Sequence, residues 1–268
     1  MGTHAQFIGT IPETYDRHLG PVIFECPARD LTGRMRVAQG AKVLEVACGT
    51  GIVTRQLLAT LPDGAELVAT DLNPPMLDHA QARVGEDPRL EWRVADAMSL
   101  PFGDGAFDAY VCQFGVMFFP DKLVAFNEAR RVLRPGGQLL FNVWRGLDQN
   151  SFGRVSNETV TAFFTSDPPK FYQTPFGWCD EALIRSTLAE AGFRDIMLER
   201  VDFPGVSESA ASSAPGLVRG NPLALATAER ATADIAKIEA AVAEALARDG
   251  GEKPWRGTLR GLVASATA

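Results

Sequence analysis

The sequence predicts an α/β fold in which helices are wound on both sides of a parallel sheet. Three observations support this prediction. Short apolar runs alternate with helical patterns five times between residues 43 and 144, which is typical of a doubly wound sheet. The first run is followed by the glycine turn Cys48-Gly49-Thr50-Gly51, and the second run ends in Asp71.

Length and charge narrow the classes of protein. The chain has 268 residues, of which 46% are hydrophobic, enough for one large domain with an insertion or for two small domains. Its net charge of −7 disfavours nucleic acid as the main partner. The arginines at 130, 131 and 134 follow a helical pattern and predict a solvated face.

Targeting and redox signals point to the cytoplasm. No run of eighteen or more apolar residues is present, so we expect no membrane span. The start of the chain has no charged region leading into an apolar one, so we expect no secretory signal. Free thiols and no metal site are predicted, because no Cys-x-x-Cys spacing joins the four cysteines, Cys26, Cys48, Cys112 and Cys179.

The stretch from Val43 to Thr54 combines a buried strand, a glycine turn and the start of a helix. Such a turn exposes backbone N–H groups, and Gly49 and Gly51 let the main chain pass a ligand without a Cβ. The next strand, residues 66–70, ends in Asp71, whose carboxylate can accept hydrogen bonds from both hydroxyls of a ribose. These features favour a nucleoside-containing cofactor over the alternative, a plain strand-to-helix turn.

The alternation continues to Trp144. A helix opens at Pro74, strands are expected at residues 90–94 and 107–112 with a loop at 100–105 between them, and Asp121 caps the next helix. The run Arg134-Pro135-Gly136-Gly137 stops that helix, and residues 138–144 form strand five.

Outside this core the pattern is irregular. Two short helices, separated near Pro27, are predicted before residue 40, packed over the cofactor end of the sheet. After Trp144 we expect helices at 151–164 and 180–191, a strand at 193–203, a loop with short helical pieces at 205–226 and a helix at 227–247. A last strand at 258–264 has a weak signal, because Gly261 interrupts it.

Together, several motifs resemble the class I S-adenosylmethionine (SAM)-dependent methyltransferases, nearest to the small-molecule type of quinone biosynthesis. The matching stretches are residues 43–51, 69–73, 95–97, 100–108 and 133–137. The resemblance implies a Rossmann-like sheet of seven strands with the last strand antiparallel, and a cap of N-terminal and inserted helices. It also implies a cap segment at 1–39 and a methyltransferase domain at 40–268, with helical insertions at about 145–178 and 205–250.

The resemblance also implies roles for individual residues. Glu45 would approach the methionine amino group, Asp71 would bind the ribose hydroxyls, and Asp96 would bind the adenine amino group. The family often has Gly at the position of Ala47, and the extra Cβ of the alanine slightly narrows the approach of the ligand. The other residues implied to contact the cofactor are Tyr15, Ala47, Cys48, Gly49, Thr50, Gly51, Leu72, Met76, Ala97, Gln113 and Phe114.

The physical chemistry of the cofactor agrees with these roles. SAM carries a sulfonium and an ammonium but no phosphate, and an acidic Glu45 suits an ammonium. Thr54 stands where a dinucleotide-binding fold usually has a third glycine, which disfavours NAD. No Gly-Lys-Ser/Thr follows the turn, so a nucleoside triphosphate is disfavoured too.

Candidates for catalysis and for acceptor binding have alternatives. His18 could be a general base for a hydroxyl acceptor, or a packing histidine. Cys48 and Cys112 are expected to be small core residues rather than nucleophiles. The aromatic stretch at 171–178 could form a lid over an apolar acceptor or a cluster that holds the insertion. The candidate acceptor-pocket residues are Met117, Phe118, Phe171, Tyr172, Phe176 and Trp178.

The expected function is SN2 transfer of a methyl group from SAM, leaving S-adenosylhomocysteine (SAH), to a small-molecule acceptor in the cytoplasm. A SAM-binding regulator without turnover is the first alternative, and an NAD-dependent oxidoreductase is the second. The acceptor, the choice among O-, N- and C-methylation, and a homodimer stay open.

Overall fold

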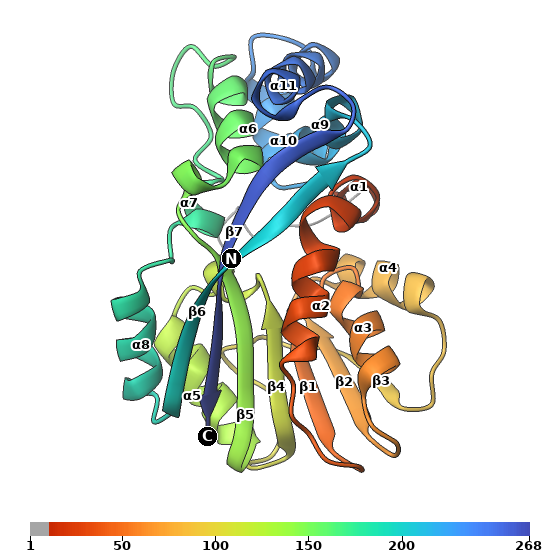
Figure 1. The fold of residues 1–268 in the computed structure, drawn as a ribbon, viewed down its shortest axis with the longest axis vertical. Helices are drawn as coiled ribbons and strands as arrows, with labels where there is room; N and C mark the ends of the chain where they lie inside the picture. The colour runs from red at the N-terminus through yellow and green to blue at the C-terminus, as the bar shows by residue number, and fades with distance from the viewer. Residues whose placement is uncertain (1–10) are drawn as a thin grey trace. The chain divides into compact units, whose positions relative to one another are not determined.

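The computed structural model describes residues 11–268, and it contains a seven-stranded sheet with the strand order β3-β2-β1-β4-β5-β7-β6 (Figure 1). Among strands β1 to β5, every neighbouring pair is parallel. The strands are β1 (Lys42–Val46), β2 (Glu66–Asp71), β3 (Leu90–Val94), β4 (Phe107–Gln113), β5 (Leu133–Trp144), β6 (Arg194–Ser207) and β7 (Trp255–Thr267).

Strand β7 runs against β5. The Gly136 N–H donates to the Ala268 carbonyl at one end, and the Arg145 N–H donates to the Arg260 carbonyl at the other, so residue numbers rise along one strand as they fall along its neighbour. The predicted seven-stranded sheet with an antiparallel last strand is therefore confirmed.

Helices join the strands. Because parallel crossovers are right-handed, α3 and α4 cover one face of the sheet and α5 covers the other, where α8 packs beside it. The helices of the core are α2 (Glu25–Gly33), α3 (Ile52–Thr60), α4 (Pro74–Val84), the 3₁₀ turn η3 (Val116–Phe118), α5 (Lys122–Val132) and α8 (Glu181–Glu190). The others are α1 (Ile11–His18), the π-helical turn η2 (Gly20–Phe24), the 3₁₀ turn η4 (Leu147–Gln149), α6 (Ser151–Thr161), α7 (Gln173–Phe176), α9 (Ala210–Arg219), α10 (Leu223–Arg230) and α11 (Ile235–Gly250).

The chain forms two compact units. The sheet unit consists of residues 27–143, 178–201 and 262–268, and the helical unit consists of the residues up to Cys26 together with 144–177 and 202–261. The helical unit thus gathers three stretches that overlap the predicted N-terminal segment and the two predicted insertions. The first ten residues of the predicted N-terminal segment lie outside the described residues.

Helix α2 belongs to the sheet unit, although the predicted cap segment ran to residue 39. Arg34 after α2 forms an ion pair with Glu199 of β6 at 2.6 Å. The Gln138 side chain of β5 accepts from the Arg36 N–H and donates to the Arg34 carbonyl. These contacts hold the residues after α2 against two strands.

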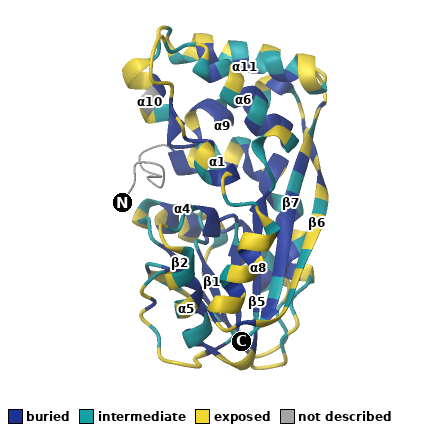
Figure 2. Ribbon diagram, turned by 90° about the vertical axis from the view of Figure 1, so that its left-hand side faces the viewer, coloured by how far each residue is buried: buried dark blue, intermediate teal, exposed yellow. Residues whose placement is uncertain are grey.

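The core of the sheet unit lies along its central strands. Val43 and Leu44 of β1, Ala69 of β2 and Val111 of β4 have no exposed surface, because strands covered on both faces are apolar throughout. In Figure 2 β1 is mostly dark blue, whereas the edge strand β6 is exposed or partly buried up to residue 202 and alternates between buried and exposed residues after it.

The core of the helical unit is built from helices and aromatic rings. Helix α9 packs against α11, α1, α6 and α10. Trp144 lies 5.3 Å from Phe152 between ring centroids, and Phe152 lies 5.8 Å from Phe176. Aromatic pairs at these separations contribute packing as well as buried area.

Three sequence predictions of helices were wrong in detail. The break near the N-terminus lies at the π-helical turn that contains Pro21, whereas Pro27 fits inside the first turn of α2, where no backbone N–H is needed. The predicted helix at 227–247 is two helices, because Asp234 caps a new start by accepting from the Lys237 N–H. The predicted loop at 205–226 contains α9, whose first turn is closed by a capping box between Ser209 and Ser212.

The weak last strand is longer than predicted. It extends over Trp255–Thr267, because pairing with β5 and β6 compensates for the glycines within it.

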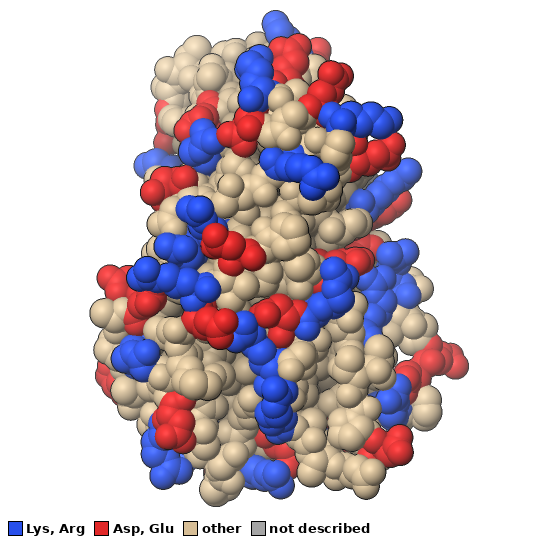
Figure 3. All heavy atoms as spheres, in the orientation of Figure 1, with Lys and Arg blue, Asp and Glu red and all other residues tan. Residues whose placement is uncertain are grey.

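The surface mixes both signs of charge. Figure 3 shows lysines and arginines interspersed with acidic residues over the visible face. Arg131 is not the solvated residue that was predicted: it donates to Glu128, to Asp104 and to the carbonyls of Leu100 and Phe102, and so shapes the loop before β4. Among the described residues, no helix is both long and apolar enough to cross a membrane.

Candidate functional site

The turn after β1 has an unusual backbone. Ala47, Gly49 and Gly51 all have positive φ, at 55°, 57° and 80°. A Cβ at Gly51 would lie 2.9 Å from Val84 and 3.2 Å from Ala80, so α4 packs directly against this glycine. A Cβ at Gly49 would meet nothing within 4 Å. The glycine at 51 therefore serves packing, while the one at 49 leaves an open face for a ligand.

Asp71 at the end of β2 braces this turn. Its side chain is 6% exposed. One carboxylate oxygen accepts from the Gly49 N–H at 2.9 Å, and the other accepts from the Asn73 N–H at 2.8 Å. Burial raises the pKa of Asp71, and these hydrogen bonds oppose the rise. The carboxylate is thus held at the rim of the open face of Gly49.

Glu45 in β1 is buried with a single hydroxyl partner. It is 1% exposed, and the Thr54 hydroxyl on α3 donates to its Oε2 at 2.6 Å. Burial raises the pKa of Glu45 to about 8, with a smaller contribution from the nearby Asp71 carboxylate. The Glu45 carboxyl is therefore largely protonated at neutral pH in the ligand-free protein.

Asp96 follows β3, the strand beside β2. One of its carboxylate oxygens accepts from the Met98 N–H at 2.8 Å, which forms a tight turn. Ala97 beside it is buried, Leu72 is partly buried, and Met76 on α4 is buried. Glu45, Asp71 and Asp96 thus stand at or near the carboxyl ends of three neighbouring strands.

The end of β4 lies across from this turn. Phe114 has φ of +49°, and its N–H donates to the buried side chain of Asn142 on β5 at 2.9 Å. A Cβ at Gly115 would lie 2.6 Å from the Cβ of Ala47, so the two turns touch. The strand order reverses between β1 and β4, and open α/β sheets bind ligands at such a switch point.

Sequence reasoning missed two residues of this site. Thr54 was used only as an argument against NAD, and Asn142 was not singled out. Neither residue has exposed surface. In the sequence, the only sign of this burial is that each is a polar residue within an apolar pattern.

The remaining candidates divide between the two units. Trp178 belongs to the sheet unit, where it lies 6.0 Å from Phe126 and 6.3 Å from Phe141 between ring centroids. Phe171, Tyr172 and Phe176 are buried in the helical unit, where the Tyr172 hydroxyl donates to Ser156 at 2.9 Å. Their part in binding an acceptor stays a prediction.

Tyr15 and His18 lie in the helical unit. The Tyr15 ring stacks on Phe24 at 4.7 Å, and His18 Nδ1 is 2.8 Å from the Ser212 carbonyl oxygen. Their roles in covering the cofactor and as a base stay predictions. Met117 is buried and Phe118 is partly buried in η3, just after β4.

The thiols near the site are unreactive. Cys48 is 7% exposed and Cys112 is fully buried. Burial raises the pKa of Cys112 to about 12 and that of Cys48 well above its ordinary value, so both stay protonated.

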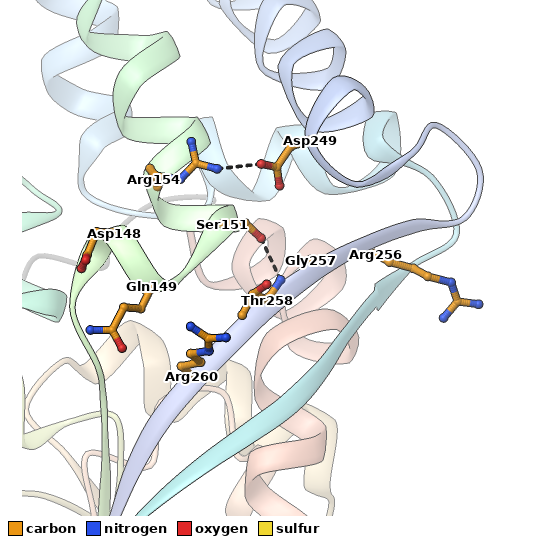
Figure 4. Close-up of a pocket in the computed structure, with 9 residues that line it drawn as sticks. All are labelled: Asp148, Gln149, Ser151, Arg154, Asp249, Arg256, Gly257, Thr258 and Arg260. Atoms are coloured by element: carbon orange, nitrogen blue, oxygen red, sulfur yellow. Dashed lines mark hydrogen bonds and ion pairs between the residues drawn. The ribbon is translucent and has the colours of Figure 1, made fainter.

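The helical unit has a polar pocket of about 250 Å³ between η4, α6, the end of α11 and β7 (Figure 4). Arg154 at its edge forms ion pairs with Asp249 at 2.6 Å and with Glu158 at 3.3 Å. The Ser151 hydroxyl accepts from the Thr258 N–H at 2.8 Å. The other residues lining it are Asp148, Gln149, Arg256, Gly257 and Arg260.

Comparison with known families finds one match within the sheet unit. Residues 44–141, which carry β1 to β4, most of β5 and the turns described above, match the methyltransferase domain family. This part of the chain is therefore similar to a methyltransferase domain.

Curated relatives match parts of this chain. An uncharacterised protein of Mycobacterium tuberculosis is 36% identical over 138 residues, which are 51% of this chain and 46% of that protein. A demethylmenaquinone methyltransferase of Staphylococcus epidermidis is 26% identical over 206 residues, 70% of this chain and 83% of its own. A ubiquinone/menaquinone biosynthesis C-methyltransferase of Cereibacter sphaeroides is 41% identical over 104 residues, 38% and 41% of the two chains. The chain therefore spans less than half the length of the first of these relatives.

Solved structures share the fold. A putative methyltransferase of Haloferax volcanii, solved with its activator, has a TM-score of 0.58 at 20% identity over 97% of this chain and 94% of that one. A phosphoethanolamine N-methyltransferase of Haemonchus contortus, solved with SAH, has a TM-score of 0.62 at 17% identity over 96% and 56% of the two chains.

The residues present fit a SAM-type ligand. The open face at Gly49 leaves room beside the backbone, Asp71 lies at its rim, and Glu45 and Asp96 stand at or near the ends of the neighbouring strands. Carboxylates accept hydrogen bonds from the hydroxyl and ammonium groups of such a ligand. A negatively charged pyrophosphate would be repelled by an ionised carboxylate.

Proposed function

We propose that this chain transfers a methyl group from SAM to a small-molecule acceptor. The observation that carries the proposal is the set of three acidic side chains, Glu45, Asp71 and Asp96, at neighbouring strand ends around the open face of Gly49. Two of the relatives are named as methyltransferases of quinone biosynthesis, which supports the same activity here.

We propose that these residues bind successive parts of the cofactor, in the order of their strands. Asp96 would accept from the adenine amino group, and Asp71 would accept from the ribose hydroxyls on the adjacent strand. Glu45 on β1 comes next in the order β3-β2-β1-β4 and would accept from the ammonium. The methionine end would then extend toward Gln113 and Phe114 at the end of β4.

The protein's task in the reaction is alignment. When bound, SAM supplies a methyl group activated by its sulfonium, which a nucleophile takes in an SN2 displacement. Holding two reactants in line can contribute about 7–11 kcal/mol of rate enhancement. Met117 and Phe118, directly after β4, would line the acceptor side and exclude water. An acceptor that carries a proton on its nucleophilic atom would need a base, for which His18 is the candidate.

The four cysteines support a reducing compartment, which we propose to be the cytoplasm. All four are free thiols, and reducing compartments keep thiols in this state.

A SAM-binding regulator without turnover is the second candidate function. The same three acidic residues would serve it, so binding alone does not separate the two proposals. Transfer of a labelled methyl group to any compound in an acceptor screen would exclude the regulator.

The first test is calorimetry with SAH and with NADH on the wild-type protein, Asp71→Asn and Asp78→Asn. Asp78 is an exposed carboxylate on α4 and serves as the matched control. We expect SAH to bind the wild type and the control equally. Asp71→Asn should bind it about 30-fold more weakly, since hydrogen bonds to a charged group are lost. Binding of NADH but not SAH would refute the proposal.

A further inference from the structure

Asn142 is a polar residue within a run of fully buried apolar residues of β5. Leu139, Leu140, Phe141 and Val143 of β5 have no exposed surface, and neither has Asn142. A buried amide is costly unless its donors and acceptors are satisfied, so its presence calls for a specific task.

Its partners are two consecutive residues at the end of β4. Asn142 Oδ1 accepts from the Phe114 N–H at 2.9 Å, and its Nδ2 donates to Gln113 Oε1 at 3.4 Å. The main-chain carbonyl of Asn142 also accepts from the Phe114 N–H, at 3.2 Å. One residue thus holds both the backbone and the side chain of this turn.

The turn needs holding because Phe114 is in a left-handed conformation, with φ of +49°. Residues with a Cβ rarely adopt this region. The conformation brings Gly115 against Ala47, which is itself left-handed at φ of +55°. Two unfavourable backbone positions therefore meet at the switch point between β1 and β4, and such positions persist only where the surroundings impose them.

We propose that Asn142 is a positioning residue that holds the Gln113–Phe114 turn in the shape that receives the methionine end of the cofactor. The inference rests on the proposed function, which extends that end of the cofactor from Glu45 toward β4. Asn142 does not touch the reacting atoms; it acts through the direction of the main chain at Phe114.

The test compares two nucleosides that differ only at the methionine end. SAH carries the aminocarboxypropyl group, and 5′-methylthioadenosine lacks it. Asn142→Leu keeps the volume and removes both side-chain hydrogen bonds, while the main-chain carbonyl of residue 142 can still accept from the Phe114 N–H. We expect this variant to bind SAH about tenfold more weakly, because preorganisation is lost. Binding of 5′-methylthioadenosine should stay within about twofold.

Gln138→Leu is the matched control. Gln138 is another residue of β5 whose side chain bonds to backbone, but it lies four residues before Asn142 and bonds to Arg34 and Arg36. It should leave both affinities unchanged. If Asn142→Leu does not fold, Asn142→Thr replaces it. Threonine is favoured in strands, and its shorter side chain is expected not to reach the Phe114 N–H.

Amide hydrogen exchange gives a readout that does not depend on the cofactor. The Phe114 amide should be protected in the wild type and exchange faster in the Asn142 variant than in the Gln138 variant. Equal weakening of both nucleosides, or unchanged SAH binding with unchanged Phe114 exchange, would overturn the role of Asn142 alone. Failure of the wild type to bind either nucleoside would refute the proposed function and this inference with it.

Discussion

The strand-end site of the sheet unit and the polar pocket of the helical unit both carry charged side chains, but they hold them differently. In the pocket, Arg154 and Asp249 neutralise each other at 2.6 Å, and Arg154 is 35% exposed. At the strand ends, Glu45 and Asp71 are almost completely buried, and their hydrogen-bond partners are a hydroxyl, backbone N–H groups and the Asn73 side-chain amide rather than a cation.

The difference supports the proposal that the strand-end site binds the ligand. A partly exposed charge that already has a counter-ion is compensated, so a further partner adds little stabilisation. A buried carboxyl without a cation raises its pKa and is completed by a ligand that brings donors or positive charge. Left-handed residues also gather at the strand ends, at Ala47, Gly49, Gly51 and Phe114.

The two glycines of the turn give the largest expected effects. Gly51→Ala should lower the free energy of unfolding by about 3 kcal/mol, because a left-handed backbone and a close contact with Val84 are both violated. Gly49→Ala carries only the backbone strain, about 1 kcal/mol, but its methyl group would fill the open face. We therefore expect Gly49→Ala to lose SAH binding while remaining folded. Denaturant unfolding and calorimetry measure both, and a reversed ranking of stabilities would contradict the packing role of Gly51.

A comparable effect, reached only by changing the pH, concerns the pH dependence of stability. The pKa of Glu45 is raised to about 8 in the folded protein, so the folded state binds more protons than the unfolded state between about pH 4.5 and 8. This stabilisation is complete below pH 4.5 and is lost as the pH rises through 8. As the pH rises from 5 to 8, the free energy of unfolding of the ligand-free protein should fall by about 3 kcal/mol.

Glu45→Gln should remove this part of the pH profile, because an amide does not titrate while its oxygen can still accept from Thr54. Urea unfolding at several pH values compares the two proteins. Identical profiles would show that Glu45 is ionised in the folded state and that its burial is compensated in another way.

The smallest effect is expected in the pocket. Arg154→Gln should lower the free energy of unfolding by less than about 1 kcal/mol, and less at high salt, because the ion pair is partly exposed. SAH affinity should not change. A large loss of SAH binding in this variant would break the comparison, since it would tie the pocket to the cofactor site.

Local signals allowed much of the fold to be predicted. Apolar runs bounded by turns located β1 to β5, and Asp121 marked the start of α5, where its carboxylate accepts from the Val124 N–H. These features depend on neighbours within a few residues, so the amino-acid sequence by itself determined them. The glycines at 49 and 51 and the acidic end of β2 belong to the same class.

Other features depend on residues that lie far apart in the chain. The hydrogen-bond partner of Glu45 is Thr54, nine residues later on α3. The partner of Phe114 is Asn142, 28 residues later on β5. The grouping of three separate stretches into the helical unit likewise has no local signal. The sequence alone determined which acidic residues and glycines stand at the strand ends, because strand ends and glycine turns are local. Only the tertiary structure decided which carboxyl is protonated and which turn is held, because burial and long-range hydrogen bonds set both.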